Sequence, residues 1–238
     1  MGKLVCVGLG PGDPDLMSVR AHRLVGAARH VAYFRKKGRM GQARRIVEGL
    51  LPDGVTEYPM DYPVTVEIPF TDPEYNRLLS EFYDDWAERL AMLCQGQDVI
   101  VLCEGDPFFY GSFMHLYTRL KDRIPVEVVP GITGMSGCWT ATGAPITWGD
   151  DVLTVAMATL PEADLAARIA QTDALVVMKI GRNLPKLTRA LQSAGKFGDA
   201  WIVTHGTMDN QTVRRLDEVT GEVPYFSIVV VHGQGRRP

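Results

Sequence analysis

Val99-Ile-Val-Leu-Cys-Glu-Gly-Asp-Pro-Phe-Phe-Tyr-Gly111 is the stretch that decides the fold. Its first part, Val99 to Leu102, is continuously apolar, as expected of a strand that is buried on both faces of a parallel sheet. The run breaks at Glu104-Gly-Asp-Pro107, where Gly permits unusual backbone angles and Pro fixes its own. Ligands of open α/β sheets bind just beyond the carboxyl ends of strands. A carboxylate, exposed backbone and aromatic rings at this point predict a small-molecule site, although an ordinary strand-to-helix turn would also fit.

The composition is that of a globular protein. Of the 238 residues, 46% are apolar and 22% are charged, which argues against disorder and against a coiled coil. The net charge of −3 and the pI of about 6.0 give no reason to expect a global attraction to nucleic acid. The length allows one large domain or two, and we expect two α/β domains, residues 1–122 and 123–238.

The cysteines predict neither a metal site nor a disulfide framework. Cys6, Cys94, Cys103 and Cys138 contain no C-x-x-C pair, so buried free thiols in a reducing cytoplasm are expected. The N-terminus enters a strand at once, and no stretch approaches the roughly 20 apolar residues of a membrane helix. We therefore expect a cytoplasmic protein that binds no metal, no membrane and no nucleic acid.

A second glycine-rich turn, Gly8-Leu-Gly-Pro-Gly-Asp-Pro14, follows the apolar strand Leu4 to Val7. A dinucleotide fingerprint would need glycine where Asp13 stands. The Gly-Lys-Ser or Gly-Lys-Thr of a phosphate-binding loop does not occur in the chain. This turn is therefore expected to serve a ligand other than a phosphate.

Two segments of the first half predict a substrate region. Arg35-Lys-Lys-Gly-Arg39 is either a solvated face or a patch for an anionic substrate. Leu51 to Asp72 is rich in Pro and is expected to be an irregular loop, and a loop of this length within a compact domain is usually functional. Asp72 and Pro73 should then begin a helix that reaches about Cys94.

Five motifs, in order along the chain, resemble those of the tetrapyrrole methylases. The first is Gly8 to Pro14 followed by Leu16 and Ala21, and the second is Glu104 to Gly111. The remaining three are Val129-Pro-Gly-Ile-Thr133, Val176-Val-Met-Lys-Ile-Gly181, and Thr204-His-Gly-Thr207 with Gln211. A single motif would identify little, whereas the ordered set is specific and covers nearly the whole chain.

The resemblance implies two αβα domains with the active site in the cleft between them, S-adenosylmethionine as cofactor and usually a homodimer. Many cofactor contacts would be made by backbone groups, which accounts for Gly and Pro where a side chain would obstruct. Asp106 could accept hydrogen bonds from the amino-acid end of the cofactor, stabilise its own turn, or do both. Carried over by position, the cofactor-binding residues are Pro11, Glu104, Gly105, Asp106, Phe109, Thr133, Gly134, Met135, Ile180, Gly206 and Ser227.

Within the family, Tyr62-Pro-Val-Thr-Val-Glu-Ile-Pro69 resembles the branch that methylates C20 of precorrin-2 in cobalamin biosynthesis. Uroporphyrinogen methylases usually have Gly where Glu104 stands and Arg where Ser112 stands, which counts against that branch. The resemblance implies a tetrapyrrole substrate whose carboxylates would pair with basic residues. The predicted substrate-binding residues are Arg35, Lys36, Lys37, Arg39, Tyr62, Thr65, Lys179 and Arg182.

The implied reaction moves a methyl group from a sulfonium to a meso carbon of the macrocycle and needs no protein nucleophile, because the conjugated nitrogens make that carbon nucleophilic. A proton must later leave the same carbon, and Glu104, Tyr110, His205 and Glu67 are unranked candidate bases. Metal-free and cobalt-containing precorrin-2 both stay open as substrates. The chain could instead methylate a protein or an RNA, or be a nucleotide-binding regulatory protein that transfers no methyl group.

Overall fold

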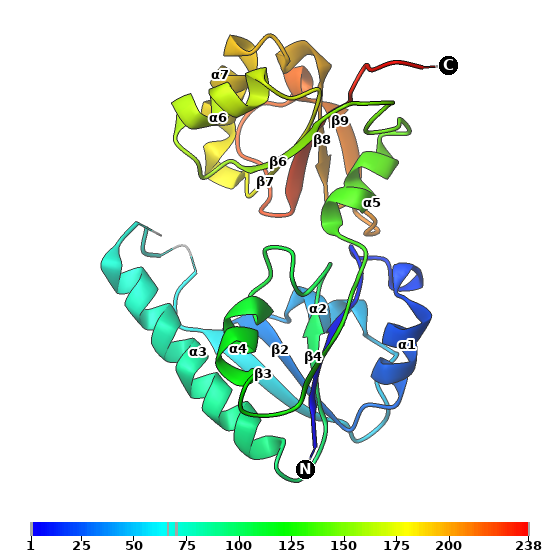
Figure 1. Cartoon of the computed structure of the whole chain (residues 1–238), viewed down its shortest axis with the longest axis vertical. Coiled ribbons are helices and arrows are strands. Elements are labelled where there is room, and N and C mark those ends of the chain that lie inside the picture. The colour runs from blue at the N-terminus through cyan, green and yellow to red at the C-terminus, as the bar shows by residue number, and fades with distance from the viewer. Residues whose placement is uncertain (1, 66, 70, 238) are drawn as a thin grey trace. The chain divides into compact units, whose positions relative to one another are not determined.

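The computed structural model describes residues 2–65, 67–69 and 71–237. The chain forms two compact units, Met1–Thr133 and Gly134–Pro238 (Figure 1). Each unit combines one sheet with helices, which confirms the expected α/β class. The division falls after Thr133 and not after residue 122, because the segment Val126–Val129 is a strand that pairs with Leu4–Val7 and so belongs to the first unit.

The strands described in the first unit form one parallel sheet, in the order β3-β2-β4-β1-β5. Cys6 and Val101 lie in one apolar cluster with residues of helices α3 and α4, whereas Val7 and Leu102 lie in another with α1 and α2. This alternation, with helices on both faces, is the αβα arrangement. The strands are β1 (Leu4–Gly8), β2 (His30–Lys36), β3 (Thr56–Tyr62), β4 (Val99–Cys103) and β5 (Val126–Val129). The helices are α1 (Val19–Gly26), α2 (Gln42–Ile46), α3 (Pro73–Leu93) and α4 (Phe113–Leu120).

The longest helix begins where the sequence predicts. The Asp72 carboxylate accepts a hydrogen bond from the Glu74 backbone N–H at 2.9 Å, and Pro73 occupies the first turn of α3. Both features stabilise a helix start. The Asp72 carboxylate satisfies a backbone N–H that has no partner within the helix, and Pro73 has no N–H that would need one. No helix within the described part of the chain is both long and apolar enough to cross a membrane.

The sequence predicts an irregular loop over Leu51 to Asp72, but part of this segment is a strand. Its first half contains β3, which pairs in parallel with β2. Pro59 obscures this strand in the sequence, because proline removes a hydrogen-bond donor from a sheet. Among the described strands β3 neighbours only β2, so it lies at the edge of the sheet, where a proline is tolerated.

The second unit has a mixed sheet in the order β6-β7-β10-β8-β9, in which only β6 and β7 are parallel among the described pairs. Apolar clusters again lie on both faces, one with α6 and α7 and the other with α5. The strands are β6 (Leu153–Met157), β7 (Ala174–Met178), β8 (Ala200–Thr204), β9 (Thr212–Arg215) and β10 (Ser227–Val231). The helices are α5 (Gly134–Ala141), α6 (Glu162–Ala170) and α7 (Leu184–Ser193).

Candidate active site

Three loops meet at the carboxyl ends of β1, β4 and β5 with their backbones in direct contact. Gly105 N donates to Gly10 O at 2.7 Å, which joins the first two loops. A Cβ atom at Gly131 would lie 2.2 Å from Gly105 O, and one at Gly8 would lie 2.6 Å from Gly131 N. Real Cβ atoms do not approach backbone this closely, so only glycine fits. The glycines of the first three motifs thus let three loops pack closely together at the carboxyl ends of the strands.

Asp106 fastens two of these loops together. One carboxylate oxygen accepts from Phe108 N at 2.9 Å, and the other accepts from Gly131 N at 3.0 Å. The turn-stabilising role considered for Asp106 is therefore confirmed. Each carboxylate oxygen has a second lone pair, so these two bonds leave acceptor capacity for a ligand. Binding of the cofactor by Asp106 stays a prediction.

Glu104 lies at the start of the same loop and has an unusual electrostatic environment. Surrounding protein removes hydration from its carboxyl group and raises its pKa to about 7. The side chain itself is exposed, so solvent partly offsets this desolvation and the upward direction carries the argument. A carboxyl group in this state can exchange a proton near neutral pH.

Tyr110, at the end of that loop, has a left-handed backbone with φ of 55°. In the second unit, Lys179 follows β7 with φ of 55°, and His205 and Thr207 follow β8 with φ of 51° and 66°. Residues other than glycine seldom adopt this conformation, and such strain concentrates at functional sites. Three of these positions, Tyr110, Lys179 and His205, are site residues that the sequence predicts.

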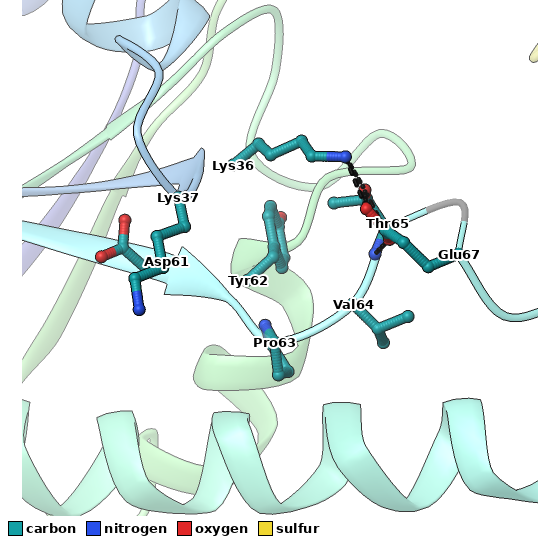
Figure 2. Close-up of a pocket in the computed structure, with 8 residues that line it drawn as sticks. All are labelled: Lys36, Lys37, Asp61, Tyr62, Pro63, Val64, Thr65 and Glu67. Atoms are coloured by element: carbon teal, nitrogen blue, oxygen red, sulfur yellow. Dashed lines mark hydrogen bonds and ion pairs between the residues drawn. The ribbon is translucent and has the colours of Figure 1, made fainter.

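A pocket of about 390 Å³ lies beside β2 and β3 in the first unit (Figure 2). Two basic residues, Lys36 and Lys37, line it from the end of β2. Of the predicted substrate residues of this unit, Lys36, Lys37, Tyr62 and Thr65 therefore share one pocket. The remaining lining residues are Asp61, Pro63, Val64 and Glu67.

Two of the basic side chains here are already paired with carboxylates. Arg35 Nε lies 2.6 Å from Asp61 Oδ1, and Lys36 Nζ lies 2.5 Å from Glu67 Oε1. The hydrogen bonds from Lys36 and Thr65 hold the pKa of the Glu67 carboxyl well below its usual range. While it is held in this way, Glu67 is the weakest of the four candidate bases. Within the described residues, Lys37 and Arg39 have no ion-pair partner.

Tyr62, which lines the pocket, belongs to an aromatic cluster. The Tyr62 ring stacks on Phe34 with their centroids 5.5 Å apart, and Phe82 of α3 packs against both. The Tyr62 hydroxyl is also hydrogen-bonded to the hydroxyl of Ser112, the residue before α4. This contact connects the pocket to the segment that follows the Glu104–Gly111 loop.

The predicted site residues of the second unit lie around its own strand ends. Ser227 is buried and donates its hydroxyl to Pro224 O at 2.7 Å, and the Ile180 side chain lies in the core. Any ligand contact by Ile180 would therefore use its backbone. A Cβ atom at Gly206 would lie 2.5 Å from Cys138 Sγ, so this glycine too is required by packing. Gln211 accepts from Thr207 N at 2.6 Å and closes the turn after β8.

Sequence reasoning missed two residues of the first unit, Asp61 and Ser112. Asp61 faces Arg35 across the β2–β3 pair, and this pairing could have been found only if β3 had been recognised. The predicted residues Lys179 and Arg182 belong to the second unit and are not part of the pocket. Arg182 follows β7 in a short 3₁₀ turn, Gly181–Asn183.

The comparisons with known proteins agree with this architecture. A precorrin-2 C(20)-methyltransferase from a Sinorhizobium species is 50% identical over all of this chain and 98% of its own length. A cobalt-precorrin-2 C(20)-methyltransferase from Salmonella typhimurium is 28% identical over 98% of this chain and 97% of its own. The crystal structure of a uroporphyrin-III C-methyltransferase from Thermus thermophilus, complexed with S-adenyl homocysteine, has a TM-score of 0.67 at 22% identity and covers 97% of each chain. The family described as Tetrapyrrole (Corrin/Porphyrin) Methylases matches residues 3–220, so the chain belongs to that family.

Proposed function

We propose that the protein is an S-adenosylmethionine-dependent methyltransferase that adds a methyl group to C20 of precorrin-2, giving precorrin-3A, in cobalamin biosynthesis. The observation that carries this proposal is the 50% identity to the Sinorhizobium precorrin-2 C(20)-methyltransferase, which extends over all of this chain and 98% of that protein. The segment Tyr62 to Pro69 lies within that aligned length, and its residues Tyr62 to Thr65 and Glu67 line the charged pocket, which supports the same branch of the family.

The closely packed glycine loops of the first unit are the region that we assign to this cofactor. Gly8 and Gly131 let the loops after β1, β4 and β5 pack backbone against backbone, because any side chain there would collide with neighbouring backbone. S-adenosylmethionine, when bound, supplies a methyl group that is already activated on a sulfonium. The residues proposed to hold it are Pro11, Glu104, Gly105, Asp106, Phe109 and Thr133 of the first unit, and Gly134, Met135, Ile180, Gly206 and Ser227 of the second.

The main catalytic task of the protein is then alignment. Holding two reacting groups in line can lower a barrier by roughly 7–11 kcal/mol without any protein nucleophile. The proton that leaves the methylated carbon needs an acceptor, and Glu104 is the best placed by its chemistry, because its raised pKa lies near neutrality. Tyr110 and His205 are the other proposed proton acceptors, supported by the left-handed backbone that presents each of them.

The basic residues are proposed to bind the carboxylates of the macrocycle. Lys37 and Arg39 are exposed and have no described ion-pair partner, which supports this role most directly. Arg35, Lys36, Tyr62, Thr65, Lys179 and Arg182 complete the proposed set. A cytoplasmic location and a homodimer are part of the same proposal, and the resemblance to the family favours the homodimer.

Cobalt-precorrin-2 is the second candidate substrate, because the Salmonella relative carries that name. The chain is 28% identical to that relative but 50% identical to the precorrin-2 C(20)-methyltransferase, so metal-free precorrin-2 is the better choice of substrate. Parallel assays with each substrate distinguish the two, since the proposal requires faster turnover of the metal-free form.

The proposal is tested by titrating the protein with S-adenosylhomocysteine in a calorimeter, followed by mass spectrometry of precorrin-2 incubated with protein and S-adenosylmethionine. We expect tight binding and the gain of a single methyl group, whose ring position NMR then establishes. Binding without any change in either form of precorrin-2 would refute the substrate but keep the family. Methylation at a carbon other than C20 would refute the regiochemistry alone.

A further inference from the structure

The pocket beside β2 and β3 contains a ready-made receptor for a carboxylate. Lys36 Nζ, Thr65 N and Thr65 Oγ1 converge on one carboxyl group, and we call these three donors the carboxylate cradle. Its present occupant is Glu67 of the same chain. Thr65 N donates to Glu67 Oε2 at 2.7 Å, and Lys36 Nζ lies 2.5 Å from Glu67 Oε1 (Figure 2). The Thr65 hydroxyl completes the set at 3.0 Å from Glu67 Oε2.

The ion pairs made by the two acidic residues that line this pocket, Asp61 and Glu67, differ in how easily they can be exchanged. Arg35 and Asp61 face each other across paired strands, and the sheet holds both backbones in place. Glu67 instead lies beyond the end of β3, and its side chain is 52% exposed against 36% for Asp61. An exposed ion pair contributes at most about 1 kcal/mol. Another carboxylate can therefore replace Glu67, whereas Asp61 is held by the strand register.

We propose that Glu67 is a built-in placeholder, which fills the carboxylate cradle until a carboxylate of the substrate displaces it. This inference rests on the proposed function for the identity of the ligand, a tetrapyrrole with several carboxylate side chains. In the substrate complex, Lys36 and Thr65 bind the incoming carboxylate and Glu67 turns to solvent. No covalent bond changes in this exchange, and the net charge of the cradle and its occupant stays the same.

A placeholder of this kind sets selectivity. Glu67 is tethered only two residues from Thr65, so its effective concentration at the cradle is high, on the order of millimolar or more. A free monocarboxylate at lower concentration cannot compete with it. A macrocycle is also held by Lys37 and by other contacts, which gives its carboxylate a comparably high local concentration at the cradle. That carboxylate can therefore compete with Glu67. Small acids of the cell are thereby excluded, while the polycarboxylate is admitted.

The test measures binding of uroporphyrin III, a stable and coloured polycarboxylate tetrapyrrole, by absorbance titration to the whole chain. Glu67→Gln and Glu67→Ala should both tighten binding, by about two- to fivefold, which corresponds to the loss of one competing exposed ion pair. Lys36→Met should weaken binding, and adding Glu67→Gln to Lys36→Met should no longer tighten it. Affinity for S-adenosylhomocysteine should be the same in all variants.

Asp61→Asn is the matched control, because it removes one negative charge from the same pocket without emptying the cradle. If it tightens uroporphyrin binding as much as Glu67→Gln does, the gain comes from the lost negative charge or from the freed Arg35 and not from an emptied cradle, and the placeholder is refuted. Weaker binding in both Glu67 variants would also refute it, since Glu67 would then be holding the pocket in its binding shape. Acetate should inhibit uroporphyrin binding more strongly in Glu67→Ala than in the wild type, and equal inhibition contradicts the selectivity argument.

Failure of the placeholder and failure of the proposed function give different results. If the wild type methylates precorrin-2 but the Glu67 variants have a raised KM, the function holds and the placeholder is wrong. If the Glu67 variants bind uroporphyrin more tightly but no variant methylates either form of precorrin-2, the placeholder holds and the assigned substrate is wrong.

Discussion

The two ligand-like regions of the first unit are built on opposite principles. The loops after β1, β4 and β5 are made of backbone packed against backbone, with Gly8, Gly105 and Gly131 in contact. The Lys36–Glu67 pocket is made of long, charged and partly exposed side chains. The first region leaves no room for substitution, whereas the second can rearrange. A rigid site suits an invariant cofactor, and an adjustable site suits a large, flexible polyanion.

The largest expected effect is at the rigid region. In Gly131→Ala, the new Cβ would lie 2.2 Å from Gly105 O and 2.9 Å from the carbonyl carbon of Gly8. Neither backbone atom can move without separating the loops, so we expect binding of S-adenosylhomocysteine to be lost and the free energy of unfolding to fall by about 1–3 kcal/mol. Calorimetric titration and thermal unfolding measure the two effects.

Gly96→Ala is the control for this substitution, because a Cβ at Gly96 would meet nothing within 4 Å. It should bind S-adenosylhomocysteine as the wild type does. Full cofactor binding by Gly131→Ala would mean that close backbone packing is not what shapes this site.

Glu104→Gln should produce the next largest effect, through loss of a proton acceptor. General bases contribute about 100-fold or more to a rate, so kcat should fall by about that factor while binding of S-adenosylhomocysteine is kept. The raised pKa leaves Glu104 protonated in acid, so wild-type kcat should rise as the pH increases from 4.5 to about 7. The rise should be absent from the variant. A variant with wild-type kcat and the same pH profile would assign the proton to another group.

The raised pKa of Glu104 also predicts a pH dependence of folding. The folded protein binds this proton more tightly than the unfolded chain does, so the favourable contribution is complete below pH 4.5 and disappears as the pH rises to about 7. Glu104→Gln should remove that dependence. Denaturant unfolding of both proteins at pH 5 and pH 8 measures it, and parallel stability curves would contradict the prediction.

Asp106→Asn should weaken cofactor binding by about tenfold. An amide can replace only one of the two carboxylate acceptors, so the bond from either Phe108 N or Gly131 N is lost. A hydrogen bond to a charged group contributes about 1.5–3 kcal/mol, part of which water restores at this partly buried position. The dissociation constant for S-adenosylhomocysteine is the measurement. An unchanged constant together with an unchanged melting temperature would show that Asp106 neither ties the loops nor contacts the cofactor.

The smallest effect is expected at the adjustable pocket. Lys37→Gln or Arg39→Gln should raise the KM for the tetrapyrrole by a few-fold, since each removes one exposed charge, and should leave cofactor affinity unchanged. The effect should shrink as ionic strength rises. Lys121→Gln, an exposed charge on the segment after α4, should have no effect on KM. An equal change in all three variants would mean that the pocket has no special role.

The rigid region could be predicted from the sequence better than the adjustable one. The Gly-Asp-Pro turns after apolar runs are local signals, and they lie at strand ends as expected. The carboxylate cradle depends on β3 bringing Thr65 and Glu67 beside the end of β2, and Pro59 concealed that strand. The compact units divide after Thr133, later than the predicted boundary at residue 122, for a similar reason. Val126–Val129 belongs with β1 through pairing across more than a hundred residues, which no local pattern reveals.

Pro59 has a further consequence, for the behaviour of the protein at high concentration. The outer edge of β3 would otherwise present unpaired N–H and C=O groups to the next molecule, as any exposed edge strand does. Proline interrupts that row, because it offers no N–H to an incoming strand. The edge is therefore protected against growth into intermolecular sheets. Pro59→Val should keep the fold, since β2 still pairs with β3, but should increase light scattering as the protein is concentrated.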